Sequence, residues 1–302
     1  MANWLLNISE KWLRPVYDVL REQLCRESVL HADETTLQVL KEPGRKNTSD
    51  SYMWVYCSIR DAVNPIRYFE YQPGRSGKYP EAFLREYEGY IHTDAYSGYN
   101  AVSGVKRCLC YTHLRRAFVD ALPKDIHNSE ASKPAEAILR LNQLFNMESE
   151  LEALPPDQKK KERLIREKPL LEAFWSWAEK SAIGELPKSK LSKAFHYALN
   201  NREGFWNYLE DGNCSISNSL AENCIRPFVI GRKNWLFSGS PKGAEASAGI
   251  YTLVETAKAN GLAPMKYIKY ILSDMPGSAF LEHPEYLDDY LPWNPLVKEF
   301  CR

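Results

Sequence analysis

Three carboxylates in this sequence stand where a metal-binding acid could face a ligand. Asp33 lies in "HADET", Asp94 in "TDAYSGYN" and Glu222 in "SLAENCIRPF", each beside small or turn-forming residues. Carboxylates that are brought together repel one another, so a cluster stays ionised mainly where divalent cations neutralise it. Paired cations can hold both oxygens of an in-line phosphoryl displacement. The three acids are therefore candidates for a phosphoryl-transfer site.

Each acid also has a local interpretation. Asp33 lies in a strand-like run, where alternation puts it on the face of Leu37 and Val39 and turns Glu34 the other way. A carboxylate on such an apolar face is costly unless it is paired or metal-bound. Asp94 could accept a hydrogen bond from its own turn, and Ser219-x-x-Glu222 fits a helix capping box. Spacing alone does not decide between these roles and catalysis.

The segment "CLCYTHLRR" offers a different set of ligands. Cys108, Cys110 and His113 could bind zinc, but no fourth ligand lies nearby in the sequence. Buried thiols on one side of a strand are the more usual outcome. His113 with Arg115 and Arg116 at a helix start is better interpreted as a cluster that faces phosphate.

The elements that must position these residues follow from the pattern of apolar side chains. Residues 3–25 have helical spacing, with a kink expected at Pro15. Three runs rich in β-branched and aromatic residues then predict an antiparallel meander. Their ranges are 28–40, 51–60 and 66–72. A helix, a strand, a short helix, a strand and a helix are expected next, which makes an α/β fold with a mixed sheet.

Two further segments are predicted to be helical. The stretch from about Pro123 to Phe205 is expected to be helical throughout, with breaks at Pro155-Pro156 and at Pro169. Its mixed-sign charge run is typical of a solvated helix face. After Glu222, the run that ends at Gly261 has helical spacing, with Ile250, Leu253, Val254 and Ala257 as its expected buried face.

Composition limits the possible classes of protein. The 302 residues include 39 basic and 39 acidic side chains, so any binding to nucleic acid must come from local patches. No run is long enough to cross a bilayer, and the start carries no signal-peptide pattern. Seven scattered cysteines suit a reducing compartment. We therefore expect a cytoplasmic protein with no membrane partner.

Four segments together resemble the catalytic part of the insertion sequence 66 family of bacterial transposases. They are "HADET", "TDAYSGYN", "CYTHLRRAF" and "AENCIRPFVIGRKNWLFSGSPKGAEASAGIYTLVETAKANGL", and the resemblance continues through "LPWNP". It implies a ribonuclease H-like mixed sheet flanked by helices, with a helical insertion before the third catalytic acid. Carried over by position, the DDE triad is Asp33, Asp94 and Glu222. Asn223, where the family usually has Arg, and the preceding "ISNSLAEN" depart from the family pattern.

The resemblance also implies how the chain is organised. We expect an N-terminal helix (1–27), a first part of the catalytic core (28–122), the helical insertion (123–205), the rest of the core with the glutamate motif (206–262) and a C-terminal tail (263–302). Full-length relatives carry an upstream zinc-finger-like and helical DNA-binding region that nothing here matches. The chain is therefore expected to be the C-terminal portion of a longer transposase, or a truncated copy.

The activity implied by the resemblance is metal-dependent cleavage and strand transfer of an insertion sequence. The expected cofactor is Mg²⁺, for which Mn²⁺ can substitute, and the expected partners are transposon ends and target DNA. Relatives of this kind are expected to form homo-oligomers on DNA and to associate with the bacterial nucleoid when bound to it.

The basic segment after Glu222 is then expected to meet the DNA backbone. From Arg226 to Lys242 it contains cations and no acid. The candidate DNA-binding residues are Arg115, Arg116, Arg226, Arg232 and Lys233, with Trp235 as a base-stacking side chain. Lys106 and Arg107 add positive charge near the first two.

The sequence alone leaves two other functions open. One is a catalytically inactive DNA-binding remnant of a truncated transposase. The other, which disregards the resemblance, is a glycosidase that uses two of the acids in an aromatic cleft. A glycosidase carboxylate pair needs no Mg²⁺, so metal dependence separates the transposase from the glycosidase. Activity on pre-cut DNA separates the transposase from the remnant.

Overall fold

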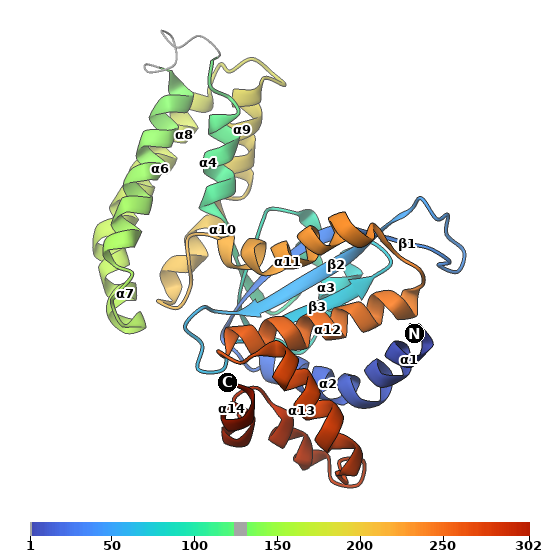
Figure 1. Cartoon of the computed structure of the whole chain (residues 1–302). Coiled ribbons are helices and arrows are strands. Elements are labelled where there is room, and N and C mark those ends of the chain that lie inside the picture. Colours follow the sequence, from blue (N-terminus) through green and yellow to red (C-terminus); the bar gives the residue numbers. More distant parts are fainter. Residues whose placement is uncertain (1, 124–131) are drawn as a thin grey trace. The chain divides into compact units, whose positions relative to one another are not determined.

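The computed structural model describes residues 2–123 and 132–302, which form a mixed six-stranded sheet flanked by helices (Figure 1). The chain divides into two compact units. The first comprises the chain up to Gly89, Ser97–Val105 and Leu220–Arg302, and the second comprises Tyr90–Tyr96 and Lys106–Ser219. Residues 124–131, which belong to the predicted insertion, lie outside the described residues.

The first unit begins with the predicted amphipathic helix, which is interrupted close to Pro15. Helix α1 (Ala2–Ile8) continues through a π-helical turn (Ser9–Leu13) into α2 (Arg14–Leu24). The Arg14 amide donates to the Ser9 carbonyl, five residues back. Since proline has no N–H and its ring crowds the preceding turn, a widened turn before Pro15 is its expected effect.

Three strands of the first unit form the predicted meander. Strand β1 (Val29–Val39) pairs antiparallel with β2 (Asp50–Ser58), which pairs antiparallel with β3 (Arg67–Gln72). The short strand β6 (Phe237–Ser238) lies parallel to β1. Asp33 stands opposite Val55 in this register. Helix α3 (Lys78–Phe83) and a 3₁₀ helix (Ser97–Ala101) follow in the predicted order.

Helices α11 (Ser219–Trp235) and α12 (Pro241–Ala259) cover one face of this meander (Figure 1). Ala221, Ile225 and Phe228 of α11 join Leu37 and Val39 of β1 in one buried apolar cluster. The two helices approach closely, because a Cβ added at Gly231 would lie 2.4 Å from the Tyr251 hydroxyl. The glutamate helix is thus fixed to the strand that carries Asp33.

Helix α12 also protects an edge of the sheet. Thr252 Oγ1 accepts a 2.8 Å hydrogen bond from the Phe69 amide, and Thr256 Oγ1 accepts one of 3.0 Å from the Arg67 amide. The expected buried face was partly wrong. Leu253 is buried, but Ile250 and Val254 are only half-buried. Small and hydroxylated side chains fill the interface instead, because they let the helix reach the backbone of β3.

The chain after α12 is folded. Helix α13 (Pro264–Asp274) is followed by 3₁₀ turns at Met275–Gly277 and Pro284–Tyr290 and by α14 (Pro295–Cys301). Tyr267 is buried and donates a 2.7 Å hydrogen bond to the Tyr290 carbonyl. The segment expected as a tail therefore forms regular elements with a buried contact between them.

The second unit contains most of β4 (Gly89–Thr93) and β5 (Val105–Leu109) and a set of helices. Helix α4 (Tyr111–Val119) packs against α6 (Lys133–Glu150) and α9 (Lys190–Asn200), and α8 (Lys168–Ala182) packs against α6 and α9 (Figure 1). The remaining helical elements are α7 (Pro156–Glu162), a π-helical turn (Arg163–Glu167), α10 (Arg202–Trp206) and a 3₁₀ helix (Asn207–Glu210).

Aromatic side chains hold this helical bundle together. Phe118 of α4 contacts Phe195 of α9 and Phe174 of α8 edge to face, with ring centroids 5.4 and 6.4 Å apart. Edge-to-face pairs of this kind contribute beyond their buried area. Among the described helices, none is both long and apolar enough to cross a membrane.

Candidate functional site

Asp33 occupies the face of β1 that the alternation predicts. Leu37 and Val39, four and six residues further along the same face, are buried under α11, while Asp33 is half-buried. Its Oδ1 accepts a 2.9 Å hydrogen bond from the Glu34 amide. Glu34 points to the opposite face, where its carboxylate accepts a 2.8 Å hydrogen bond from the Tyr99 hydroxyl and pairs with Arg75. The two neighbouring acids therefore have different environments.

Glu222 lies in the first turn of α11 and is half-buried. Its neighbours Ala221 and Ile225 are buried in the core of the first unit, so the helix cannot rotate without exposing them. Helix α11 begins at Ser219, so Glu222 lies where either a capping box or a ligand role would place it.

Asp94 directly follows β4 and takes part in the turn that the sequence suggested. Its Oδ1 accepts a 2.9 Å hydrogen bond from the Tyr96 amide. The Arg107 guanidinium donates to the carbonyl oxygens of Asp94 and Tyr96 over 2.6 and 2.7 Å, and to Thr93 Oγ1 over 2.7 Å. The carboxylate is therefore presented from a turn with a fixed backbone.

Asp94 lines a cavity of about 330 Å³ within the second unit. The other lining residues are Ala95, Tyr96, His113, Arg116, Ala117, Asp120, Tyr197 and Asn201. Burial, together with the negative charges of Cys110 and Asp94, raises the pKa of Tyr197 above its ordinary value. Tyr197 and Asn201 come from the end of α9, and no local pattern in the sequence marked them.

Cys110 and His113 interact at the start of α4, where Cys110 is the N-cap residue. The Asn218 amide donates a 3.2 Å hydrogen bond to the Cys110 sulfur. Burial opposes ionisation of this thiol, but the hydrogen bonds from His113 and Asn218 outweigh it and hold its pKa below the ordinary value. Cys108 has other partners, so the two cysteines of "CLC" belong to separate clusters.

Three of the predicted DNA-binding side chains, Arg116, Arg226 and Lys233, are exposed. Arg226 and Lys233 are seven residues apart on α11, so they share one face of that helix, and Arg116 lines the Asp94 cavity. These three cations are accessible to a polyanion from solvent.

The remaining predicted contacts to DNA already have partners within the chain. Arg115 donates a 2.8 Å hydrogen bond to Asn142 Oδ1, and Arg232 donates one of 2.9 Å to Thr36 Oγ1. Trp235 contacts Phe228 edge to face at 5.3 Å and packs against the apolar core. Lys106 pairs with Glu210.

The three acids are divided between the two units. Asp33 and Glu222 belong to the first and Asp94 to the second. All three offer carboxylate oxygens, the donor type that Mg²⁺ prefers. Each stands on a regular element or directly after one, so its backbone is fixed by pairing or packing.

Comparison with protein families identifies the class of protein. The family described as "Transposase IS66 family" matches residues 1–246, and the "IS66 C-terminal element" matches residues 252–293. The chain therefore belongs to the IS66 transposase family, as its sequence motifs suggested.

Individual relatives agree with this assignment. The chain is 29% identical to the Sinorhizobium fredii protein named "Uncharacterized protein y4qI", over 97% of this chain and 56% of the relative. It is 27% identical to "Uncharacterized protein y4hP" of the same organism, over 93% of this chain and 53% of the relative. The chain thus spans about half the length of the curated relatives it matches. No solved structure matches it significantly.

Proposed function

We propose that this chain is the catalytic portion of a DNA transposase that cleaves and joins DNA strands with the help of divalent cations. Asp33, Asp94 and Glu222 are the proposed metal ligands and catalytic acids. The observation that carries the proposal is the position of Asp33 on the sheet face covered by α11, the helix whose first turn contains Glu222. Membership in a transposase family favours phosphoryl transfer over glycoside hydrolysis.

The strand and helix order supports a ribonuclease H-like core within this proposal. The order is three antiparallel strands, a helix, a strand, a short helix, a strand and a helix. Helices α6 to α10 then precede the glutamate helix, which is where the proposed insertion stands. The proposed domain boundaries remain those expected from the sequence, namely 1–27, 28–122, 123–205, 206–262 and 263–302.

The donor set fits Mg²⁺, with Mn²⁺ as a substitute. When bound, such ions neutralise the phosphate charge and stabilise the attacking and leaving oxygens. The carboxylates hold and orient the reacting groups, first for attack by water at the transposon end and then for attack by the released 3′ hydroxyl on target DNA. Both steps are in-line displacements, so no covalent enzyme intermediate is required.

DNA is the proposed partner, as transposon ends and as target, at the nucleoid and with self-association on the DNA. Arg116, Arg226 and Lys233 are proposed as primary phosphate contacts because they are exposed. Arg115, Arg232 and Trp235 are proposed to hold the DNA-binding surface in place, since each already contacts another part of the chain.

Metal binding and activity can be tested together. Mg²⁺ or Mn²⁺ should raise the melting temperature, because a ligand that binds only the folded state stabilises it by mass action. Asp33→Asn should abolish that shift and also abolish joining of pre-cut duplexes. Asp61→Asn, which changes an exposed acid in a turn, is the matched control and should retain both.

The outcomes separate the competing functions. An Asp33→Asn variant that unfolds easily but keeps the metal-dependent shift would show that Asp33 is structural. Metal-dependent stabilisation without joining activity would support the inactive DNA-binding remnant instead.

A further inference from the structure

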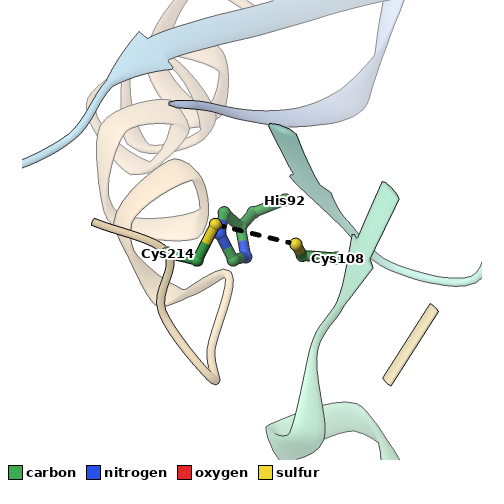
Figure 2. Close-up of side chains that lie close together, drawn as sticks. All are labelled: His92, Cys108 and Cys214. Carbon is green, nitrogen blue, oxygen red and sulfur yellow. Dashed lines mark hydrogen bonds between the residues drawn. The ribbon is translucent and has the colours of Figure 1, made fainter. Parts of the chain in front are cut away.

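Three potential ligands for a soft metal ion, none of them one of the proposed catalytic acids, meet inside the second unit. His92 comes from β4, Cys108 from β5, and Cys214 from the segment that precedes α11 (Figure 2). Their ligand atoms all lie within 4.8 Å of one another. Relative exposure is 0% for His92 and Cys108 and 1% for Cys214, so the cluster is closed to solvent.

The distance between the two sulfurs fits a shared ion. The Sγ atoms of Cys108 and Cys214 are 3.9 Å apart. With metal–sulfur bonds of about 2.3 Å, two thiolates on one ion are separated by about 3.8 Å at a tetrahedral angle and about 4.0 Å at a trigonal angle. A disulfide would require the sulfurs to approach to about 2.05 Å. The cluster is therefore close to the spacing of a metal centre.

The imidazole has a nitrogen suited to complete the site. The Ser215 amide donates a 3.2 Å hydrogen bond to His92 Nε2, so this nitrogen carries its lone pair toward the segment that holds Cys214. A metal ion would take that lone pair in place of the Ser215 amide. Nδ1 would then keep its proton, the usual arrangement for a metal-bound histidine.

A buried arginine fixes the segment that supplies Cys214. Arg163 donates hydrogen bonds of 2.7 Å to the Cys214 carbonyl and 3.1 Å to the Asp211 carbonyl, and it pairs with Glu148. A Cβ at Gly212 would lie 1.8 Å from the Pro156 carbonyl oxygen, so only glycine permits this close approach. Cys214 is thus positioned by contacts that do not depend on a metal.

We propose that His92, Cys108 and Cys214 bind one thiophilic metal ion, either Cu⁺ with these three ligands or Zn²⁺ with a bound water as its fourth ligand. Thiolate and imidazole donors select these ions over Mg²⁺. Binding replaces two S–H bonds by two metal–sulfur bonds and releases the two protons to solvent. The ion would join β4, two residues before Asp94, to the segment eight residues before Glu222. The proposal does not depend on transposase activity.

The test uses the full chain and measures bound metal directly. Protein stripped with a chelator under reducing conditions is titrated with Co²⁺ as a spectroscopic probe for zinc, and separately with Zn²⁺ and with Cu⁺. We expect one ion per chain, intense thiolate-to-cobalt charge-transfer absorption and a higher melting temperature. Elemental analysis of the protein as purified then distinguishes zinc from copper.

Variants assign the ligands. Cys108→Ser and Cys214→Ser should each weaken binding by at least the roughly 10- to 100-fold that loss of a supporting partner costs. Cys224→Ser is the matched control, because Cys224 also forms a thiol–thiol contact, with Cys57, elsewhere in the chain. It should leave metal binding unchanged.

If the serine variants fail to fold, the metal titration of the unmodified protein still tests the proposal. An absence of thiolate charge transfer in that protein would overturn the proposal. So would a Cys108–Cys214 disulfide without metal after purification in the absence of reductant, or an equal loss of binding in Cys224→Ser.

Discussion

Arg107 holds the backbone of Asp94, since its Nη2 donates a 2.6 Å hydrogen bond to the Asp94 carbonyl oxygen. The same guanidinium bonds Thr93 and Tyr96, on either side of the acid. The position of the Asp94 carboxylate therefore depends on a cation thirteen residues later in the chain.

Removing this contact should reduce activity without unfolding the protein. Arg107→Gln is expected to lower strand joining by up to about 100-fold, because small displacements of catalytic groups cost that much. The measurement is the rate of joining on pre-cut duplexes, with the fold checked by circular dichroism. Lys106→Gln is the control, since Lys106 pairs with the exposed Glu210. Equal activity of the Arg107 and Lys106 variants would show that the turn does not need Arg107.

Glu222 offers a direct separation of catalysis from helix capping. Glu222→Gln should fold normally, since Gln can replace Glu in a capping box and loss of a cap costs typically ~1 kcal/mol. Strand transfer should nevertheless be lost, because an amide is a poor ligand for a divalent cation. Denaturant unfolding and a joining assay on the same preparation measure both properties. Retained activity would leave Glu222 with a structural role alone.

The exposed cations of α11 should account for part of the salt dependence of DNA binding. Each phosphate contact contributes about −0.9 to the slope of log affinity against log salt, so Arg226→Gln with Lys233→Gln should make the slope shallower by about 1.8. All duplexes should be weakened alike, because phosphates carry no sequence information. Lys193→Gln with Lys269→Gln removes two exposed cations from other helices and is the control.

Arg232 is expected to behave differently from its neighbours on α11. It bonds Thr36 of β1, so Arg232→Gln should lower the free energy of unfolding by about 1 kcal/mol. Its effect on the salt slope should be smaller than that of Lys233→Gln. A filter-binding titration on two unrelated duplexes measures the slopes, and strong discrimination between the duplexes would place the DNA surface elsewhere.

Glu167 should make the second unit less stable as pH rises. Burial and the nearby charge of Glu148 raise its pKa to about 8, and the Tyr208 hydroxyl donates to it over 2.8 Å. Between the ordinary pKa of about 4.3 and this value, the folded state holds a proton that the unfolded state has released. The contribution of Glu167 to the free energy of unfolding therefore falls as pH increases, by at most about 1.4 kcal/mol per pH unit.

The variant Glu167→Gln isolates this contribution. Its amide oxygen can still accept from Tyr208, so it should fold and lose most of the decline in melting temperature between pH 5 and pH 8 (roughly the window set by the two pKa values). Glu185→Gln, which changes a surface acid paired with Lys133, is the control. A decline as steep in Glu167→Gln as in the unaltered protein would show that Glu167 is ionised when folded.

Local sequence pattern was sufficient for the strands and for the environment of Asp33. Alternation along β1 determined that Asp33 and Glu34 face opposite ways, because side chains of a strand must alternate. The order of elements up to α4 followed from runs of β-branched residues separated by turn residues. Asp33, Asp94 and Glu222 could be selected as candidates because carboxylates beside apolar or turn residues stand out in a sequence, but their assignment as a triad rests on the family resemblance and stays a prediction.

Contacts between distant segments could not be predicted in the same way. Cys214 lies 106 residues from Cys108, and nothing in the spacing of the cysteines indicates that the two sulfurs meet. Arg107 was predicted only to add positive charge near Arg115 and Arg116, since a sequence does not show which carbonyl oxygens lie within its reach. The buried face of α12 was partly missed because its alanines and threonines give a weak hydrophobic signal but a close fit to β3.

The most direct test of the proposed function is a crystal structure of the chain with Mn²⁺, analysed by anomalous scattering. We expect a manganese peak coordinated by carboxylate oxygens of Asp33, Asp94 and Glu222, and no such peak in crystals of Asp33→Asn. Manganese bound elsewhere, or three carboxylates too far apart to share ions in the presence of saturating Mn²⁺, would contradict the assignment of these acids as the catalytic site.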